Sequence, residues 1–249
     1  MKKLIYISFL LLCMLYISLQ GNSTFETVFD TPTPFCYSRG EFSFAFTTYD
    51  EGGINVRAII GINERILLGI TEFIDGIIGT GINRWHTPGV LFKMRLLDNP
   101  IEGFNLGIGY NPLYNGAFME YEKRAYGISV VGSKGFFLFG DYPHLLSFGA
   151  NFPLLPDEAR SFSETKLFTS IVFDISEYID FSTELQNIGF NAGKHHYFIW
   201  NNSITFSFSE SLNCKFIVQL TDDYYERIEN EKFSLRTSRL ILISYTGFF

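Results

Sequence analysis

The chain ends in SRLILISYTGFF, residues 238–249, a segment rich in β-forming residues that stops on phenylalanine. The last residues of a soluble domain are usually frayed and polar. Counted back in steps of two, one face of an extended strand would carry Phe249, Gly247, Tyr245, Ile243 and Ile241. Apart from the glycine, this face is apolar or aromatic, which predicts the closing strand of a β-barrel.

The terminal strand also matches the pattern that the assembly machinery reads in bacterial outer-membrane proteins. That pattern is a terminal aromatic residue with apolar residues at every second position before it. An aromatic residue anchors at the membrane interface, and an unpaired strand can add to an open sheet edge. We predict an assembly signal formed by Ile241, Ile243, Tyr245 and Phe249, with outer-membrane lipid and the barrel-assembly machinery as partners. The alternative is a soluble sheet strand that happens to be last.

Alternation of apolar and polar residues recurs along the chain. In EFSFAFTTY, residues 41–49, the three phenylalanines share one face. Similar stretches occupy residues 54–62, 65–73, 88–97, 102–110, 124–133, 135–151, 164–174, 177–187, 196–208, 212–221 and 233–248. They give about 12 strands (roughly 10 to 14) of about 10 residues, as is typical of outer-membrane barrels. We predict an all-β fold, an antiparallel transmembrane β-barrel.

Composition favours a membrane barrel over a soluble domain. The chain is 18% aromatic, with 28 Phe and 14 Tyr, and its mean hydropathy is +0.13. Beyond the N-terminus, no apolar run approaches the roughly 18 residues that a transmembrane helix needs. Short apolar pieces suit a barrel, because only every second residue of a strand faces lipid. The alternation alone also fits a soluble β-sandwich whose apolar face forms a core.

The first 21 residues, MKKLIYISFLLLCMLYISLQG, have the layout of a secretory signal peptide, with a positive start and an apolar stretch. We predict its cleavage and localisation in the outer membrane of a diderm bacterium; the alternative is a single membrane anchor. A short N-terminal segment, residues 22–35, is kept extended or turned by Pro32 and Pro34. Residues 36–249 would then form one barrel domain.

Charge and cysteine content narrow the function classes. The signal peptide holds two of the 19 basic residues and none of the 26 acidic ones, so the mature chain carries a net charge of −9. This net charge argues against a nucleic-acid partner, which would require a basic face. Cys36 and Cys214 remain after cleavage, and the sequence leaves open whether they pair.

Six charged residues are predicted to point into the barrel lumen from the alternating strands. They are Arg57, Lys93, Arg95, Asp180, Glu184 and Lys215. One interpretation is a solute path whose selectivity these charges set. The other is a lattice of mutual ion pairs that fills the barrel and holds it rigid. Both signs of charge are present, so both interpretations stay open.

The candidates for metal binding and catalysis do not have the required geometry. His195 and His196 are adjacent, so in a regular strand they point to opposite faces and cannot share one metal ion. A lipid hydrolase needs a serine nucleophile beside a histidine on the outer face, but His144 and Ser147 have a spacing that puts them on opposite faces. We therefore predict no enzyme activity, no metal site and no cofactor. A lipid-modifying enzyme is the alternative function.

Segments at both ends and in the middle of the chain carry a family pattern. They are DTPTPF (30–35), RGEFSFAFTTYDEGGINVRAIIGINERILLGI (39–70), PGVLFKMRLLD (88–98), GFNLGIGY (103–110) and RLILISYTGFF (239–249). The closing pattern falls on Arg239, Ile243, Tyr245 and Phe249. These segments resemble bacterial outer-membrane barrels loosely related to the YjbH-like proteins, which are linked with exopolysaccharide export. The shared motifs are turns and strand faces, so the resemblance implies fold and location more than activity.

We expect a passive channel, or a structural protein associated with envelope polysaccharide and its export components. The alternatives are the lipid-modifying enzyme and a soluble periplasmic β-sandwich that binds a ligand. The sequence does not decide whether the lumen is open.

Overall fold

The computed structural model describes residues 28–49, 52–79, 84–85, 88–99, 103–113, 125–138, 142–153, 165–189, 198–222 and 235–249. The predicted signal peptide lies outside these residues. In the part of the chain that the structure describes, no helix is long and apolar enough to cross a membrane.

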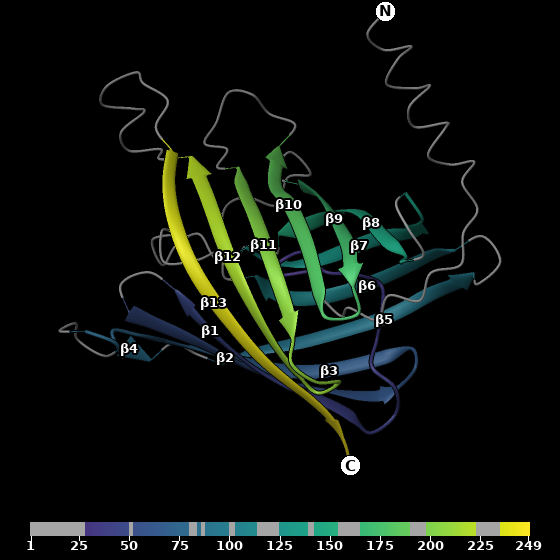
Figure 1. Ribbon diagram of the computed structural model, residues 1–249, viewed down its shortest axis with the longest axis horizontal. Coiled ribbons are helices and arrows are strands. Elements are labelled where there is room, and N and C mark those ends of the chain that lie inside the picture. Colours follow the sequence, from purple (N-terminus) through teal and green to yellow (C-terminus); the bar gives the residue numbers. More distant parts are fainter. Residues whose placement is uncertain are drawn as a thin grey trace, which may run out of the picture.

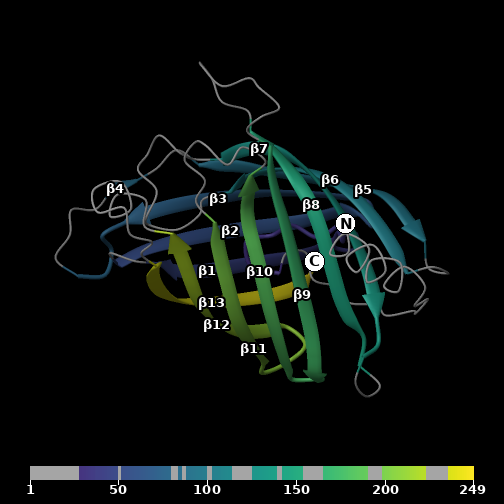
Figure 2. The ribbon, with the colours of Figure 1, turned by 90° about the horizontal axis from the view of Figure 1, so that it is seen from above.

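Within the described residues, twelve antiparallel strands close into a barrel (Figures 1 and 2). They are β1 (Glu41–Tyr49), β2 (Gly53–Asn63), β3 (Ile66–Asp75), β5 (Gly89–Asn99), β6 (Phe104–Leu113), β7 (Ala125–Phe136), β8 (His144–Pro153), β9 (Lys166–Ser176), β10 (Ile179–Gly189), β11 (Ile199–Ser207), β12 (Leu212–Asp222) and β13 (Leu235–Phe248). The two-residue β4 (Arg84–Trp85) adds to the end of β3. The ring closes because β1 pairs with β2 and with β13, and β2 pairs with β3. The predicted antiparallel barrel of about 12 strands is confirmed, and β13 closes it.

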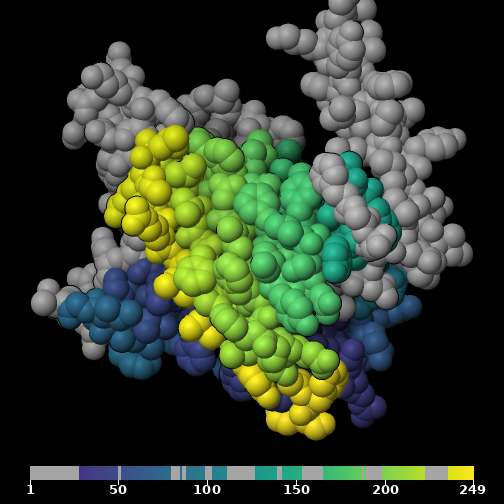
Figure 3. Space-filling view, viewed as in Figure 1, coloured from purple at the N-terminus to yellow at the C-terminus, as the bar shows by residue number. Residues whose placement is uncertain are grey.

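The strands separate an apolar outer face from a largely polar inner face, as their alternating sequences require. Large hydrophobic side chains 45% to 55% exposed lie on the outside: Phe44, Phe46, Phe148, Phe216 and Ile243. Polar side chains at most 1% exposed lie on the inside: Ser133, Ser147, Glu184, Asn201 and Gln219. Figure 3 shows the side chains of β9 to β13 covering one side of the molecule.

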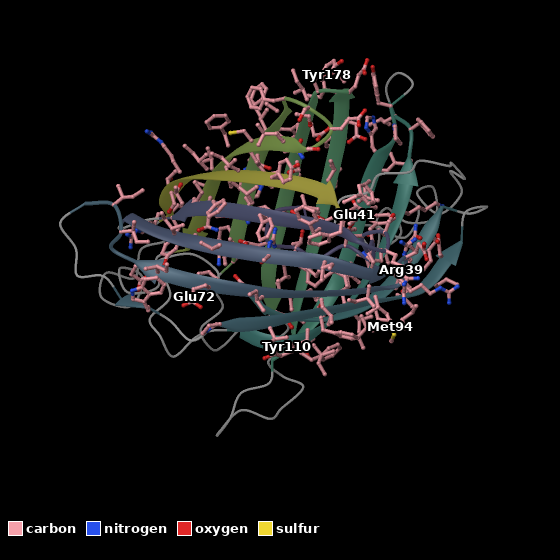
Figure 4. The ribbon with its side chains drawn as sticks, turned by 90° about the horizontal axis from the view of Figure 1, so that it is seen from below. Arg39, Glu41, Glu72, Met94, Tyr110 and Tyr178 are labelled. Carbon is pink, nitrogen blue, oxygen red and sulfur yellow. The ribbon has the colours of Figure 1, made fainter. Side chains whose placement is uncertain are left out.

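The two ends of the barrel differ in the length of their connections. At one end only two residues separate β2 from β3 and β9 from β10, and residues 208–211 link β11 to β12. At the other end, longer connections span residues 76–88, 114–124, 154–165 and 223–234. Figure 4 shows Arg39 and Glu41 toward the short-turn end, and Glu72 nearer the opposite end. The chain enters β1 at the short-turn end.

Residues 28–38, which precede β1, lie inside the barrel (Figure 1). We call residues 28–38 the lumen segment (purple in Figures 1 and 2). Within it Val28, Thr31 and Thr33 are at most 2% exposed. No strand of the described barrel includes this segment, so side chains and hydrogen bonds hold it in place.

Three apolar clusters are built around the lumen segment. Phe29 packs with inward side chains of β1, β3, β12 and β13, namely Tyr49, Phe73, Ile217, Leu240 and Leu242. Val28 and Phe35 pack with Leu145 and Val172. Cys36 and Tyr37 pack against Ile59, Leu67 and Leu91. The segment therefore touches strands from all round the ring and forms the centre of the core.

Two glycines of the barrel wall allow the lumen segment to approach closely. A Cβ added to Gly61 on β2 would lie 2.1 Å from the carbonyl oxygen of Ser38. A Cβ added to Gly107 on β6 would lie 2.8 Å from the Cα of Pro34. At Gly61 a side chain would collide with two backbone carbonyl groups, so the passage of the segment requires glycine there, whereas at Gly107 a side chain fits only if Pro34 shifts away from the wall.

Candidate functional site

Glu184 on β10 holds the first part of the lumen segment. Its carboxylate is 1% exposed and accepts hydrogen bonds from the backbone N–H of Phe29 and from that of Asp30, the latter at 3.2 Å. The hydroxyl of Thr31 donates to it at 3.1 Å. A buried carboxylate needs several donors to replace its lost water, and the lumen segment supplies three.

The barrel wall supplies two further donors to the same carboxylate. The side-chain amides of Gln186 and Asn201 donate to Glu184 at 3.3 Å and 3.1 Å. Gln219 in turn donates to Asn201 at 3.0 Å. The Glu184 carboxylate is thus shared between a fixed network on β10, β11 and β12 and the segment that crosses the lumen.

Lys215 on β12 binds a backbone carbonyl group in the same part of the lumen segment. Its buried ammonium donates to the carbonyl oxygen of Val28. Glu184, Asp180 and Asp30 act on this ammonium as favourable neighbouring charges, and Arg57 acts as an unfavourable one. Glu184 therefore accepts hydrogen bonds from N–H groups of the segment, and Lys215 donates one to a C=O group. Both kinds are charge-assisted.

Lys93 on β5 holds the other part of the lumen segment. Its ammonium donates to the carbonyl oxygen of Phe35 at 3.3 Å, and the side chain is 5% exposed. In the ring order of the twelve strands, β5 lies on the far side from β10 and β12. Because the segment is anchored on both sides, it crosses the lumen.

The six predicted lumen charges therefore fall into three places. Arg57, Glu184 and Lys215 lie around residues 28–31, and Asp180 acts on the Lys215 ammonium. Lys93 contacts the segment further along, and Arg95 lies elsewhere. Arg95 pairs with Asp98 at 2.8 Å, close to the turn that follows β5. Asp180 is also in register with Asp174 of β9, so that two carboxyl groups lie side by side on the inner wall. The functional role of all six stays a prediction.

Asp30, which belongs to the lumen segment and not to a barrel strand, carries an unusual carboxyl group. Burial and the neighbouring Glu184 carboxylate raise the pKa of Asp30 to about 8, while the Arg57 guanidinium acts in the opposite direction. Asp30 therefore holds a proton more readily when docked than when exposed to water.

A row of polar side chains winds along the inner wall, and sequence analysis missed it. Direct register pairs link, strand by strand from β6 to β13, Asn105, Ser133, Ser147, Ser170, Glu184, Asn201, Gln219 and Ser238. It starts near the short-turn end of β6 and finishes near the long-connection end of β13. The Asn105 Oδ1, Ser170 Oγ and Gln219 Oε1 atoms have no hydrogen-bond partner among the described residues. The alternation predicts that these residues face inward, but only the register aligns them.

The lumen segment borders two hollows. The larger, about 190 Å³, lies toward the short-turn end and is lined by Glu41, Ser43, Asn213 and Thr246, among others. The smaller, about 50 Å³, lies toward the other end beside Thr47, Tyr49 and Asn55. Val28 borders the first and Phe29 and Asp30 border the second, whereas Arg57 and Leu242 line both.

The candidate catalytic pair does not come together. Ser147 is fully buried on the inner face, with its hydroxyl 2.6 Å from that of Ser133. His144 lies on the other face of β8, between the rings of Phe136 and Phe173. A serine inside the lumen cannot meet a lipid on the outer surface. His195 and His196 lie outside the described residues. Among the residues that the structure describes, no group of three or more side chains is suited to a metal ion.

The predicted assembly-signal residues lie on and just beyond β13. Ile241, Ile243 and Tyr245 are 40% to 48% exposed on the outer face, and Phe249 is 89% exposed with its ring 4.6 Å from that of Phe42. Their role in assembly stays a prediction. Cys36 and Cys214 are not joined by a disulfide bond.

These features define a closed antiparallel β-barrel with an apolar exterior and a polar lumen that its own N-terminal segment crosses. No protein-family model matches the chain, and no curated protein matches it. Among solved structures, the chain is similar to a KdgM porin, with 12% identity, a TM-score of 0.48, and coverage of 84% of this chain and 99% of that chain. It is similar also to a NanC porin, with 10% identity, a TM-score of 0.47, and coverage of 84% and 98%. The barrel itself is established by the strand pairing described above.

Proposed function

We propose that this protein is a passive channel for small polar solutes in the bacterial outer membrane. The observation that carries the proposal is the polarity of the barrel. Phenylalanine and isoleucine side chains stay exposed on the outside while serine, asparagine and glutamine are buried inside. A water-soluble sandwich requires the reverse, whereas a transmembrane barrel requires this arrangement.

The two unequal ends support an orientation. Outer-membrane barrels have short periplasmic turns and longer extracellular loops. By this rule the β2–β3, β9–β10 and β11–β12 turns face the periplasm, and the lumen segment runs inward from that side. The larger hollow then opens toward the periplasm, and the smaller one lies toward the cell exterior.

The lumen wall supports passage of solutes rather than catalysis. Its polar row offers hydroxyl and amide groups along most of the barrel, which suits solutes that exchange water for hydrogen bonds as they move. Ser147, the candidate nucleophile, is part of this row and hydrogen-bonds to Ser133. We therefore propose a non-enzymatic function.

The test combines gel mobility with conductance. Membrane-extracted protein should migrate differently on SDS gels before and after boiling, because a closed barrel resists SDS until heat unfolds it. It should fractionate with the outer membrane and conduct ions in planar bilayers. Recovery in the soluble periplasmic fraction without a heat shift would contradict the membrane barrel. A heat-shifted barrel without conductance, in the wild type and in variants that free the lumen segment, would contradict the channel.

The resemblance to YjbH-like barrels supports a second proposal, that the channel works beside the envelope polysaccharide-export components. Crosslinking in whole cells followed by purification should recover such components with this protein. Recovery of the assembly machinery alone would contradict this association while leaving the channel proposal in place.

A further inference from the structure

We propose that the lumen segment is a plug that closes the channel, and that release of its Glu184 and Lys215 anchors opens it. This inference rests on the proposed channel function and adds its regulation. The inference depends on hydrogen bonds to the segment. Glu184 accepts them from Phe29, Asp30 and Thr31, and Lys215 donates one to Val28.

The position of the segment blocks the path through the barrel. It is anchored to β10 and β12 on one side and through Phe35 to β5 on the other. Residues of the segment line both hollows of the lumen. Val28 of the segment lines one hollow, Phe29 and Asp30 line the other, and Arg57 and Leu242 of the wall line both, so a solute meets segment and wall together on its way through.

The barrel wall does not depend on the segment for its closure. All twelve strands pair with each other around the ring, and the segment belongs to none of them. When the segment leaves, Glu184 keeps the Gln186 and Asn201 amides as donors and gains water in the opened lumen. The wall can thus persist in a plugged and an unplugged state, as a two-state gate requires.

The release variant is Glu184→Gln. Glutamine keeps the shape of the side chain but removes the charge and replaces one acceptor oxygen with an NH₂ group that faces backbone N–H donors. We expect the open fraction in planar bilayers to rise at least about tenfold, since charge-assisted hydrogen bonds are lost. The matched control is Ser182→Ala, on the same face of β10, whose hydroxyl contacts Ser203 and not the segment. This control should leave the open fraction unchanged.

The locking variant joins the segment to the wall by a disulfide. A Cβ built on Gly107 lies 3.1 Å from the Cβ of Pro34. A disulfide needs about 3.5–4.5 Å between these atoms, so a small displacement accommodates Pro34→Cys with Gly107→Cys. Cys36 and Cys214 are replaced by serine in this background. Glu184→Gln is included in this background so that the reduced segment is free to leave; the oxidised protein should then be closed, and reduction should open it.

A second readout follows the segment itself. In a Cys214→Ser background, Cys36 of the lumen segment is the thiol to be labelled with a large maleimide. Labelling should be about tenfold faster in Glu184→Gln than in Ser182→Ala, because undocking brings Cys36 away from Ile59, Leu67 and Leu91.

The outcomes separate the plug from the channel. Equal conductance of the oxidised and reduced tether, with the disulfide verified by mass spectrometry, would overturn the plug and leave the channel standing. Equal labelling rates of Cys36 in Glu184→Gln and in Ser182→Ala would also overturn the plug. If the heat-shifted barrel conducts in none of the variants, the channel function fails, and the plug fails with it.

Discussion

At the scale of residues, two inward cations on β5 have different partners although they are two positions apart. Lys93 holds the Phe35 carbonyl, whereas Arg95 pairs with Asp98 near the turn. We predict that Lys93→Met raises the open fraction several-fold, because leaving the Phe35 carbonyl unpaired costs about 1–3 kcal/mol. Arg95→Met should change it less than about twofold, since its charge pair is partly exposed and contributes little. Single-channel recording measures both, and equal effects would contradict the assignment of Lys93 as an anchor.

Asp30 predicts how the plug responds to pH. Its pKa is raised from 3.8 to about 8 when docked, so the docked segment binds a proton that the free segment releases. Docking of the segment is therefore most favourable at a pH below the pKa of the free Asp30 carboxyl group. It weakens as the pH rises through the pKa of the docked Asp30. The groups around Asp30 are the charged side chains of Glu184, Arg57 and Lys215, with the Gln186 and Asn201 amides. The open fraction should be lower at pH 5 than at pH 9.

Asp30→Asn provides the control for this pH dependence. Asparagine imitates the protonated carboxyl group at every pH, so this variant should stay mostly closed across the range. If the variant keeps the pH profile of the wild type, another group is responsible and the assignment to Asp30 is wrong.

At the scale of elements, the crossing of β2 by the lumen segment depends on Gly61. An alanine there would place its Cβ against the Ser38 and Tyr37 carbonyl oxygens, which cannot move without shifting the segment. We predict that Gly61→Ala opens the channel while the heat shift on gels remains. Gly109→Ala on β6 is the matched control, because the three atoms nearest to its added Cβ all belong to barrel strands. Similar conductance of the two variants would contradict the steric argument.

The last strand carries a prediction about assembly. Phe249 is almost fully exposed next to Phe42, so its ring contributes little to the folded barrel and is available to be recognised. Phe249→Ala should lower the yield of heat-shifted barrel in the outer membrane several-fold, while the stability of the protein that does assemble is unchanged. Phe248→Ala, one residue away on the strand's other face, should have a smaller effect. Equal yields would remove the assembly role from Phe249.

The comparison of sequence and structure shows which elements are predictable. Strands such as β11 could be found because a period of two is a local property, visible in the alternation of Asn201, Ser203 and Thr205 with Ile204 and Phe206. The same alternation predicted that Glu184 shares a face with Asp180 and Ser182. It could not supply the partner, since the Glu184 contact with Phe29 spans 155 residues and depends on the register of every intervening strand. The prolines predicted an extended N-terminal segment but not its place in the lumen.

At the scale of the whole molecule, two sources of stability can be separated by deleting residues 28–36. Strand pairing around the ring is independent of the segment, so the deleted protein should still form a closed, heat-shifted barrel. The three apolar clusters would lose Val28, Phe29, Phe35 and Cys36, and each large side chain contributes about 1.5–3 kcal/mol when buried. We therefore expect the gel shift to occur at a lower boiling temperature than in the wild type, together with a permanently open conductance. A deleted protein that fails to close would instead mean that the segment is a structural core. A deleted protein that closes but conducts no more than the wild type would mean that other residues block the lumen.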